Sequence, residues 1–367
     1  MKWLEYIKLQ KLDLYIIKKF LGTYFFSLAL IIIVIVVFDY NEKIDKFATS
    51  NATASEIIFD YYVNFAPSLA NTFSALFVFI SVIYFTSKLA DNSEIIAMFA
   101  SGVSFRRLMK PYMVSAAIIS LMTFILSAYV IPRGNETRLA FEQQHNRKKK
   151  TEAASNIQVK LDSTTIAYME RYESRNNMGW RFSLDKIEDK KLVSHMTAAT
   201  ITYNPERPHV WTARRWMIRE LHGDVEVIRS SMREPLDTVI PLEPSDFLIS
   251  EGEQETMTSP ELSEYIDKQK ARGMANIQGF EIEYHKRIAM SFAAFILTVI
   301  GASLSSRKKK GGMGMSLGIG LALSFSYILF QAISSAFAAQ MPVALAVWLP
   351  NILYTFIAIH LYRKAPR

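Results

Sequence analysis

A glycine-rich run from Gly311 to Gly320 is the part of the sequence that most resembles a phosphate-binding loop. Such a loop follows a strand and ends in Gly-Lys-Ser/Thr, because the lysine and the hydroxyl hold the phosphates and Mg²⁺. This run lacks that ending and leads into a long apolar segment. Gly314 and Gly318 instead have the four-residue spacing of a face on which membrane helices pack closely. We predict that these two glycines serve helix packing or a gate.

Residues typical of metal sites and catalytic centres are not arranged for chemistry. The six histidines show no metal-ligand spacing, and the chain has no cysteine. Structural zinc sites take Cys and His at short, fixed intervals. Neither a nucleophile elbow nor a zinc signature appears. We therefore predict that the chain is not an enzyme and has no catalytic residue, metal or cofactor of its own.

The short segment from Asp91 to Arg107 has the pattern of a helix of about residues 92–102. Asp91 or Ser93 is a candidate cap, and a glycine ends the pattern. One interpretation is an amphipathic helix at the headgroup level. The other is a coupling helix that docks into a cytoplasmic partner, with a charged contact and a small-residue face. Its candidate docking residues are Glu94, Ala97, Ala100, Ser101 and Gly102.

Six long apolar segments surround these elements, three on each side of a polar insert. A helix needs roughly 20 apolar residues to cross a hydrocarbon core of ~30 Å. We predict spans at Phe20–Phe38, Phe65–Phe85, Tyr112–Ile131, Ile288–Leu304, Leu317–Ala339 and Val343–Tyr362.

The distribution of Lys and Arg predicts the orientation of these spans. Basic residues gather before span one (among them Lys2 and Lys8), between spans two and three, between spans four and five (Arg307–Lys310), and after span six (including Arg367). Basic loops stay in the cytoplasm, so both termini should lie inside and the insert outside. The insert itself is nearly neutral, with 22 Lys+Arg against 23 Asp+Glu in residues 132–275. The basic net charge is thus a topology signal rather than a nucleic-acid surface.

The insert has the pattern of a β domain. Seven short alternating runs lie between Ile157 and Leu242, separated by Asn, Pro and Gly turns, which predicts an antiparallel sandwich or jelly roll. Ser259 and Pro260 then open a helix. The predicted fold is a polytopic six-helix membrane protein, three plus three, with an inserted antiparallel β jelly-roll domain. Its expected parts are an N-terminal membrane half (residues 1–131), the inserted β domain (132–275) and a C-terminal membrane half (276–367).

The coupling segment also resembles a known family. Ser93-Glu-Ile-Ile-Ala-Met-Phe-Ala-Ser-Gly102 is similar to the Ser-Glu-Leu-x-x-x-x-Ala-Ser-Gly segment of the LptF/LptG lipopolysaccharide export permeases. The likeness covers essentially the whole chain. Further similar features are Arg106 and Pro111, Lys43-Ile-Asp45, Pro67, Ile131-Pro132, Glu283-Tyr-His-Lys-Arg-Ile288 and the glycine-rich entry to span five. Ala198-Ala-Thr-Ile-Thr-Tyr203 with Val210-Trp211 is slightly more similar to LptG.

This resemblance implies half of a transporter in the bacterial inner membrane. Family members pair as LptF with LptG and bind two copies of an LptB-type ATPase, which holds ATP and Mg²⁺. They extract lipopolysaccharide from the outer leaflet and pass it through periplasmic β domains to LptC/LptA-type bridge proteins. Spans one and five line the cavity and its gates. Both termini would be cytoplasmic and the β domain periplasmic.

Three basic residues lie just outside spans one and three, where they could meet lipid phosphates: Lys43, Lys46 and Arg133. Lysines near span ends also snorkel to the interface without binding a ligand, and Asp45 could neutralise one of them. Both interpretations stay open.

Two other classes of function also stay open. A mechanotransmitting permease would move an external domain without carrying lipid, although it would need a long helical stalk rather than a β domain. A membrane-anchored sensor or assembly factor would depend on no ATPase and hold no lipid.

Overall fold

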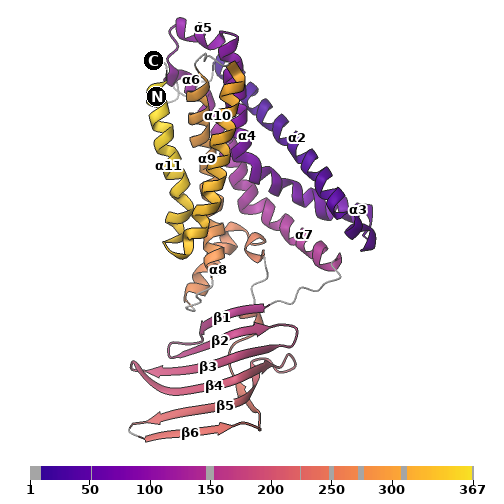
Figure 1. Cartoon of the computed structure of the whole chain (residues 1–367), viewed down its shortest axis with the longest axis vertical. Helices are drawn as coiled ribbons and strands as arrows, with labels where there is room; N and C mark the ends of the chain where they lie inside the picture. The colour runs from indigo at the N-terminus through magenta and orange to yellow at the C-terminus, as the bar shows by residue number, and fades with distance from the viewer. Residues whose placement is uncertain are drawn as a thin grey trace. The chain divides into compact units, whose positions relative to one another are not determined.

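The computed structural model describes residues 10–50, 52–145, 153–223, 225–247, 252–271, 277–306 and 312–365. Lys2, Lys8, Arg307–Lys310 and Arg367, which contribute to the predicted orientation, lie outside these ranges. The chain forms two compact units (Figure 1). The helical unit comprises Met1–Arg147, Glu255–Ser259 and Glu281–Arg367, and the β unit comprises Lys148–Gln254 and Pro260–Phe280.

The described part of the chain contains six helices that are long and apolar enough to cross a membrane. The sheet is inserted between the third and the fourth, which confirms the predicted three-plus-three layout. In chain order the helical elements are α2 (Lys11–Thr49), α3 (Ala54–Glu56), π-helix η1 (Ile57–Tyr62), α4 (Val63–Asp91), α5 (Glu94–Ala100), α6 (Phe105–Ile125), π-helix η2 (Leu126–Val130), α7 (Ile131–His145), 3₁₀ helices η3 (Pro244–Asp246) and η4 (Glu253–Glu255), α8 (Ser259–Ala271), α9 (Gln278–Ser305), α10 (Gly312–Ala336), 3₁₀ helix η5 (Phe337–Ala339) and α11 (Val343–Lys364).

The first three membrane helices are longer than their apolar segments. α2 has 39 residues, which at ~1.5 Å per residue is about 58 Å, roughly twice a ~30 Å hydrocarbon core. The second runs from Ala54 to Asp91 and the third from Phe105 to His145. A capping box starts the second helix: the Thr53 hydroxyl accepts from the Glu56 backbone N–H at 3.3 Å, and the Glu56 carboxylate accepts from the Thr53 N–H at 2.8 Å.

α4 lies at the centre of the helical unit and packs against both α2 and α10. Two thirds of its most apolar window, 67%, is buried, against 17% for α2. Phe79, Val82 and Ile83 of α4 are fully buried. Buried hydrogen bonds add to this packing, because a polar group in a membrane helix needs a partner: Tyr24 Oη lies 2.8 Å from Ser74 Oγ, and Thr86 Oγ1 lies 2.8 Å from Tyr112 Oη.

The β unit is built on one antiparallel sheet of seven strands. The strands are β1 (Ala153–Lys160), β2 (Thr165–Glu173), β3 (Met178–Glu188), β4 (Lys191–Tyr203), β5 (Val210–His222), β6 (Val225–Ser231) and β7 (Leu236–Val239). β1 to β6 pair in sequence order and β7 pairs with β5. The predicted antiparallel β domain is confirmed, and its described strands form a single sheet. Trp211 and Tyr172 are fully buried, and the Trp211 indole N–H donates to the Leu242 carbonyl at 2.9 Å.

The turn between β1 and β2 is held by one carboxylate. Asp162 Oδ1 accepts from the Thr164 N–H at 2.7 Å, from the Thr164 hydroxyl at 2.8 Å and from the Thr165 N–H at 2.8 Å. These bonds favour the ionised form and lower the pKa of Asp162 to about 2.

The short strap Glu255–Ser259 belongs to the helical unit, although the chain on both sides of it belongs to the β unit. Arg287 of α9 holds the strap: its guanidinium donates to the Met257 carbonyl at 2.8 Å and to the Ser259 hydroxyl at 3.3 Å. Glu283 accepts from the same guanidinium at 2.9 Å. Asn135 of α7 adds a bond from its amide to the Glu255 carbonyl at 3.3 Å.

Candidate functional site

The predicted coupling helix is α5, a short helix between α4 and α6 at the end of the helical unit where α11 ends (Figure 1). Ser93 takes the position before its first residue with a left-handed φ of 63°, and its side chain makes no capping hydrogen bond. The candidate serine cap is therefore a tight turn instead. Left-handed backbone is costly for a residue with a Cβ, so the fold imposes this joint between α4 and α5.

A Schellman motif ends α5. The Gly102 N–H donates to the Phe99 carbonyl at 3.0 Å, and the Val103 N–H donates to the Met98 carbonyl at 3.1 Å. Gly102 itself has φ +90°, a conformation that glycine adopts readily and other residues do not. The prediction that Gly102 ends this helix is confirmed.

α5 has one anchored face and one exposed face. Ile95 is fully buried, and Met98 and Phe99 pack against the same core cluster. The predicted docking residues Ala97, Ala100, Ser101 and Gly102 are all exposed. Ile96 is 49% exposed beside them. The chain thus presents a surface of small residues with one large apolar side chain.

Glu94, the predicted charged contact, is linked to the first membrane helix. Its carboxylate accepts from the Tyr15 hydroxyl of α2 at 3.2 Å and from the Asn92 amide at 3.3 Å. Glu94 remains partly exposed, so a partner can still reach its carboxylate.

An ion pair between a buried aspartate and a half-buried arginine fastens the start of α2 to the start of α6. Arg107 Nη1 lies 2.6 Å from Asp13 Oδ1, and Arg107 Nη2 lies 2.9 Å from Asp13 Oδ2. The Asp13 side chain is 1% exposed, and Gln10 Oε1 accepts a third bond from Arg107 at 3.0 Å. This bidentate geometry resists both sliding and rotation. Sequence reasoning counted Arg107 only as a topology charge and missed Asp13; an acidic residue between Lys11 and Lys18 was the available signal.

At the other end of α2, Lys43 is already paired. Its ammonium lies 2.9 Å from Asp39 Oδ1, donates to the Tyr61 hydroxyl, and stands over the Tyr61 ring at 4.6 Å from its centroid. The Tyr62 hydroxyl donates to Asp39 at 3.1 Å. The carboxylate that pairs with Lys43 is therefore Asp39, and the π-helical segment η1 supplies both tyrosines.

A second cation, Arg138, lies near Lys43, and both stand over the ring of Phe65. The Arg138 guanidinium of α7 is 5.4 Å from the centroid of the Phe65 ring, and Lys43 is 5.8 Å from that centroid. Within the described part of the chain, the buried Arg138 Nε has no hydrogen-bond partner. Sequence reasoning did not single out Arg138.

The other two predicted cations have different surroundings. Lys46 is exposed on α2. Arg133 lies 3.5 Å from Glu136, one turn along α7, with 62% of its side chain exposed. The site around Phe65 therefore consists of Lys43 and Arg138.

Among the described residues, the two predicted packing glycines of α10 make no close approach to another helix. A Cβ on Gly314 or on Gly318 would meet nothing within 4 Å, whereas a Cβ on Gly320 would stand 2.2 Å from Ile83 Cδ1. Gly301 of α9 makes a similar approach, 2.9 Å from Val82 Cγ1. Close packing inside the helical unit thus uses Gly301 and Gly320, whereas Gly314 and Gly318 are exposed among the described residues.

Among the described residues, no group of three or more His, Cys, Asp or Glu is placed to hold a metal ion. His195 pairs with Asp185 across β3 and β4, which is a local contact within the sheet.

A family model described as lipopolysaccharide export system permease LptF/LptG matches residues 14–364 of the chain. The match includes the six membrane helices, the sheet and α5. No curated protein matches the chain significantly in sequence.

Proposed function

Since the chain belongs to the LptF/LptG family of lipopolysaccharide export permeases, we propose that it is the permease half of an ABC transporter that extracts lipopolysaccharide from the outer leaflet of the inner membrane. A separate ATPase drives it, and the lipid passes through the β unit toward the outer membrane. The observation that carries this proposal is α5, with its buried Ile95, its exposed small-residue surface and its link to α2 through Glu94 and Tyr15.

Energy has to come from outside this chain. Each CH₂ group withdrawn from the bilayer costs roughly 0.8 kcal/mol, and lipid A carries several acyl chains. The sequence contains no Gly-Lys-Ser/Thr phosphate loop. We therefore assign ATP and Mg²⁺ to two copies of an LptB-type ATPase, one of which docks on α5 of this chain, and the chain itself is a transport subunit rather than an enzyme.

Movement that the ATPase imposes on α5 reaches α2 through two connections. A displacement of α5 pulls on Tyr15 through Glu94, and the Asp13–Arg107 pair carries any movement of the start of α6 to the same helix. α2 is buried over only 17% of its most apolar window, so it has few contacts that oppose a tilt. This arrangement supports α2 as a gate helix, together with α10.

Lipid phosphates are met by cations near the outer ends of α2 and α7. Lys43 and Arg138 flank Phe65, and the guanidinium of Arg138 suits a phosphate because it donates several hydrogen bonds from one plane. Lys46 and Arg133 extend the basic rim. Lys43 contributes charge while staying bonded to Asp39.

The remaining assignments follow the family. Both termini and α5 lie in the cytoplasm, and the β unit lies in the periplasm. A second permease half packs on the Gly314 and Gly318 face of α10, and LptC/LptA-type proteins continue the lipid path. Ala198 to Tyr203 with Val210 and Trp211 favours LptG over LptF. By function, the chain divides into an N-terminal membrane half (residues 1–131), a β domain (132–275) and a C-terminal membrane half (276–367).

The test is ATP-driven release of lipopolysaccharide from proteoliposomes that contain this chain, its partner half and the ATPase. Glu94→Arg should abolish release while the chain stays folded and inserted. Tyr15→Phe is the companion variant: it keeps the Glu94 carboxylate but removes its hydrogen bond to α2, so it should lower release without weakening ATPase binding. If ATPase binding and lipid release both survive in Glu94→Arg, α5 is not the coupling element.

Copurification with mass spectrometry separates this function from the alternatives. Bound lipopolysaccharide and a small ATPase support the export permease. An ATPase without lipid indicates a mechanotransmitting permease, and neither component indicates a sensor or an assembly factor.

A further inference from the structure

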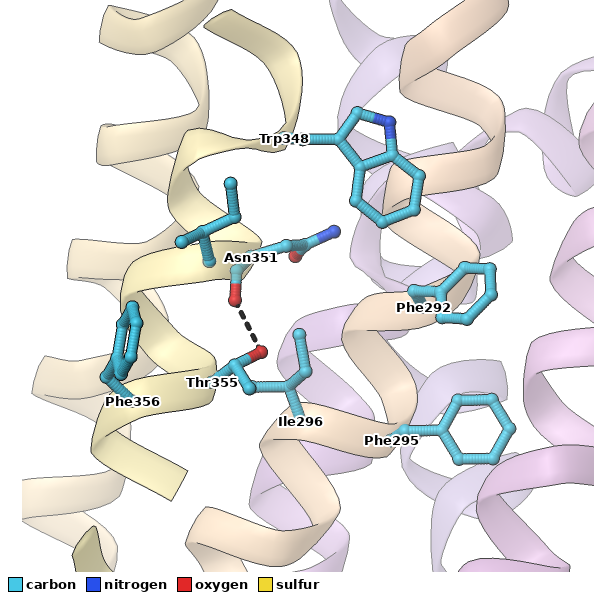
Figure 2. A pocket seen from close by; sticks show the side chains of 8 residues that line it. Phe292, Phe295, Ile296, Trp348, Asn351, Thr355 and Phe356 are labelled. Atoms are coloured by element: carbon cyan, nitrogen blue, oxygen red, sulfur yellow. Dashed lines mark hydrogen bonds between the residues drawn. The ribbon is translucent and has the colours of Figure 1, made fainter. Parts of the chain in front are cut away.

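An apolar groove lies between α9 and α11, and no residue of α2 or α10 lines it (Figure 2). Its volume is about 560 Å³, which is within the ~300–1,000 Å³ of typical ligand pockets. Phe292 and Trp348 contact each other in its lining, with their ring centroids 5.5 Å apart. The other principal lining residues are Phe295, Ile296, Thr355 and Phe356.

Asn351 and Thr355, two polar side chains of the groove, are already hydrogen-bonded within the protein. The buried Asn351 donates from its amide to the Ala289 carbonyl at 2.7 Å, and its side-chain oxygen accepts from the Tyr327 hydroxyl at 2.8 Å. The Thr355 hydroxyl donates to the Asn351 carbonyl at 2.7 Å (Figure 2). A ligand therefore meets no free hydrogen-bonding partner in these two side chains, and hydrocarbon is the matching chemistry.

The walls of the groove favour an extended hydrocarbon chain over a helix. The groove runs along α11 from Trp348 to Phe356, over which the helix rises about 12 Å. Helices pair in membranes through small residues, whereas bulky aromatic rings form these walls.

The surroundings leave one source for the occupant. Both walls belong to helices that are long and apolar enough to cross a membrane, and Phe292 and Phe356 are 49% and 67% exposed. Water does not fill an apolar cavity stably, so the bilayer must. We infer that this groove binds one acyl chain of a membrane phospholipid. The site is separate from the helices assigned above to lipopolysaccharide, and the inference rests on the membrane spans rather than on the transport function.

Trp348 allows a direct test with the full chain in nanodiscs made from a phosphatidylcholine whose acyl chains are brominated, mixed with its unbrominated counterpart. Bromine quenches tryptophan on contact. Emission of Trp348 is obtained as the difference between the parent protein and Trp348→Phe. A single bound chain predicts quenching that rises in proportion to the brominated fraction.

A reporter outside the groove provides the control. Leu121 of α6 is 61% exposed, and Leu121→Trp in the Trp348→Phe background should contact several lipids and show a curved dependence. Thr355→Phe should fill the groove, reduce the quenching of Trp348 several-fold and remove one retained phospholipid from the native mass spectrum. Should Thr355→Phe fail to fold, the comparison of Trp348 with Leu121→Trp decides alone.

Three results would overturn the inference. Trp348 and Leu121→Trp giving the same curve would mean ordinary boundary lipid. Absence of quenching at Trp348 would mean that the groove is closed. Loss of quenching when lipopolysaccharide is added would place the groove on the export path and make lipopolysaccharide the occupant.

Discussion

Asp13 and Arg107 form a bidentate ion pair that joins the first turn of α2 to the first turn of α6, and the aspartate is completely buried. α5 lies between α4 and α6 along the chain, so the pair ties a helix proposed to move to the segment that follows the coupling helix.

Arg107→Ala should lower the free energy of unfolding by about 3 kcal/mol, because it leaves a buried carboxylate without its partner. Arg107→Lys should lower the free energy of unfolding by less, since lysine keeps the positive charge but cannot form the two parallel hydrogen bonds of the guanidinium. Thermal unfolding in nanodiscs measures both. The double exchange Asp13→Arg with Arg107→Asp should recover part of the loss, and equal damage from all three variants would show that the pair itself contributes little.

Gly102→Ala should weaken ATPase binding without unfolding the spans. No atom lies within 4 Å of the added Cβ, so the cost is the left-handed backbone at φ +90°, about 1–2 kcal/mol. Hydrogen exchange of α5 and affinity for the ATPase are the measurements. Gly22→Ala is the matched control, because its Cβ also meets nothing and its φ is not positive. Unchanged α5 protection in Gly102→Ala would contradict the expectation.

Gly301→Ala should lower the melting temperature of the isolated chain, since its Cβ would press on Val82 and overpacking costs about 1–3 kcal/mol. Gly314→Ala and Gly318→Ala should not lower the melting temperature, because each added Cβ meets no described atom within 4 Å and alanine is favoured over glycine inside a helix. If a second permease half packs on α10, Gly314→Leu should reduce pairing in a pull-down assay. Pairing at the parental level would remove Gly314 from that interface.

Arg138→Gln should weaken retention of lipopolysaccharide about tenfold, the loss expected for one charge-assisted hydrogen bond of at least ~1.5 kcal/mol. Lys46→Gln, an exposed control, should have a smaller effect. Retention is measured by mass spectrometry of the purified protein. Dephosphorylated lipid should bind the parent and Arg138→Gln equally, and a persisting difference would mean that Arg138 acts through packing on Phe65.

Asp162 should make the β unit sensitive to acid. Its pKa is about 2 in the folded chain against an ordinary 3.8, so the unfolded state binds protons first. The stabilisation is therefore complete above about pH 5 and is lost as the pH falls through 4 toward 2. Asp162→Asn should melt below the parent at pH 7, and the gap should close at pH 2. Tryptophan emission of the β unit, followed during heating, measures the melting temperatures of the parent and of Asp162→Asn at each pH.

Local patterns were sufficient for much of the fold. Long uncharged segments predicted all six membrane helices, alternating runs predicted seven strands, and Gly102 marked the end of α5. The Thr53–Glu56 capping box is equally local and was readable, although the sequence reasoning overlooked it. Each of these features depends on residues close together in the chain, where composition and spacing are informative.

Contacts between distant segments were not predictable in this way. Asp13 and Arg107 are 94 positions apart, and each resembles an ordinary charge near a span end. For Lys43 the sequence left open a phosphate contact, snorkelling to the interface or neutralisation by Asp45. In the structure Asp39 holds it from one turn away, and two tyrosines of η1 complete its surroundings. Gly320 packs on Ile83, while a Cβ on Gly314 would meet no described atom within 4 Å, because the orientation of α10 depends on its neighbours rather than on its own glycine spacing.

The strap Glu255–Ser259 makes the β unit a double insertion. The polypeptide leaves the helical unit after Arg147, returns for five residues held by Arg287, leaves again at Pro260 and returns at Glu281. The two units are therefore joined by four chain connections, so release of the seven strands takes two cuts and complete separation of the units takes four. A chain cut once at any of these connections should run under denaturing conditions as two fragments, each of which retains membrane helices.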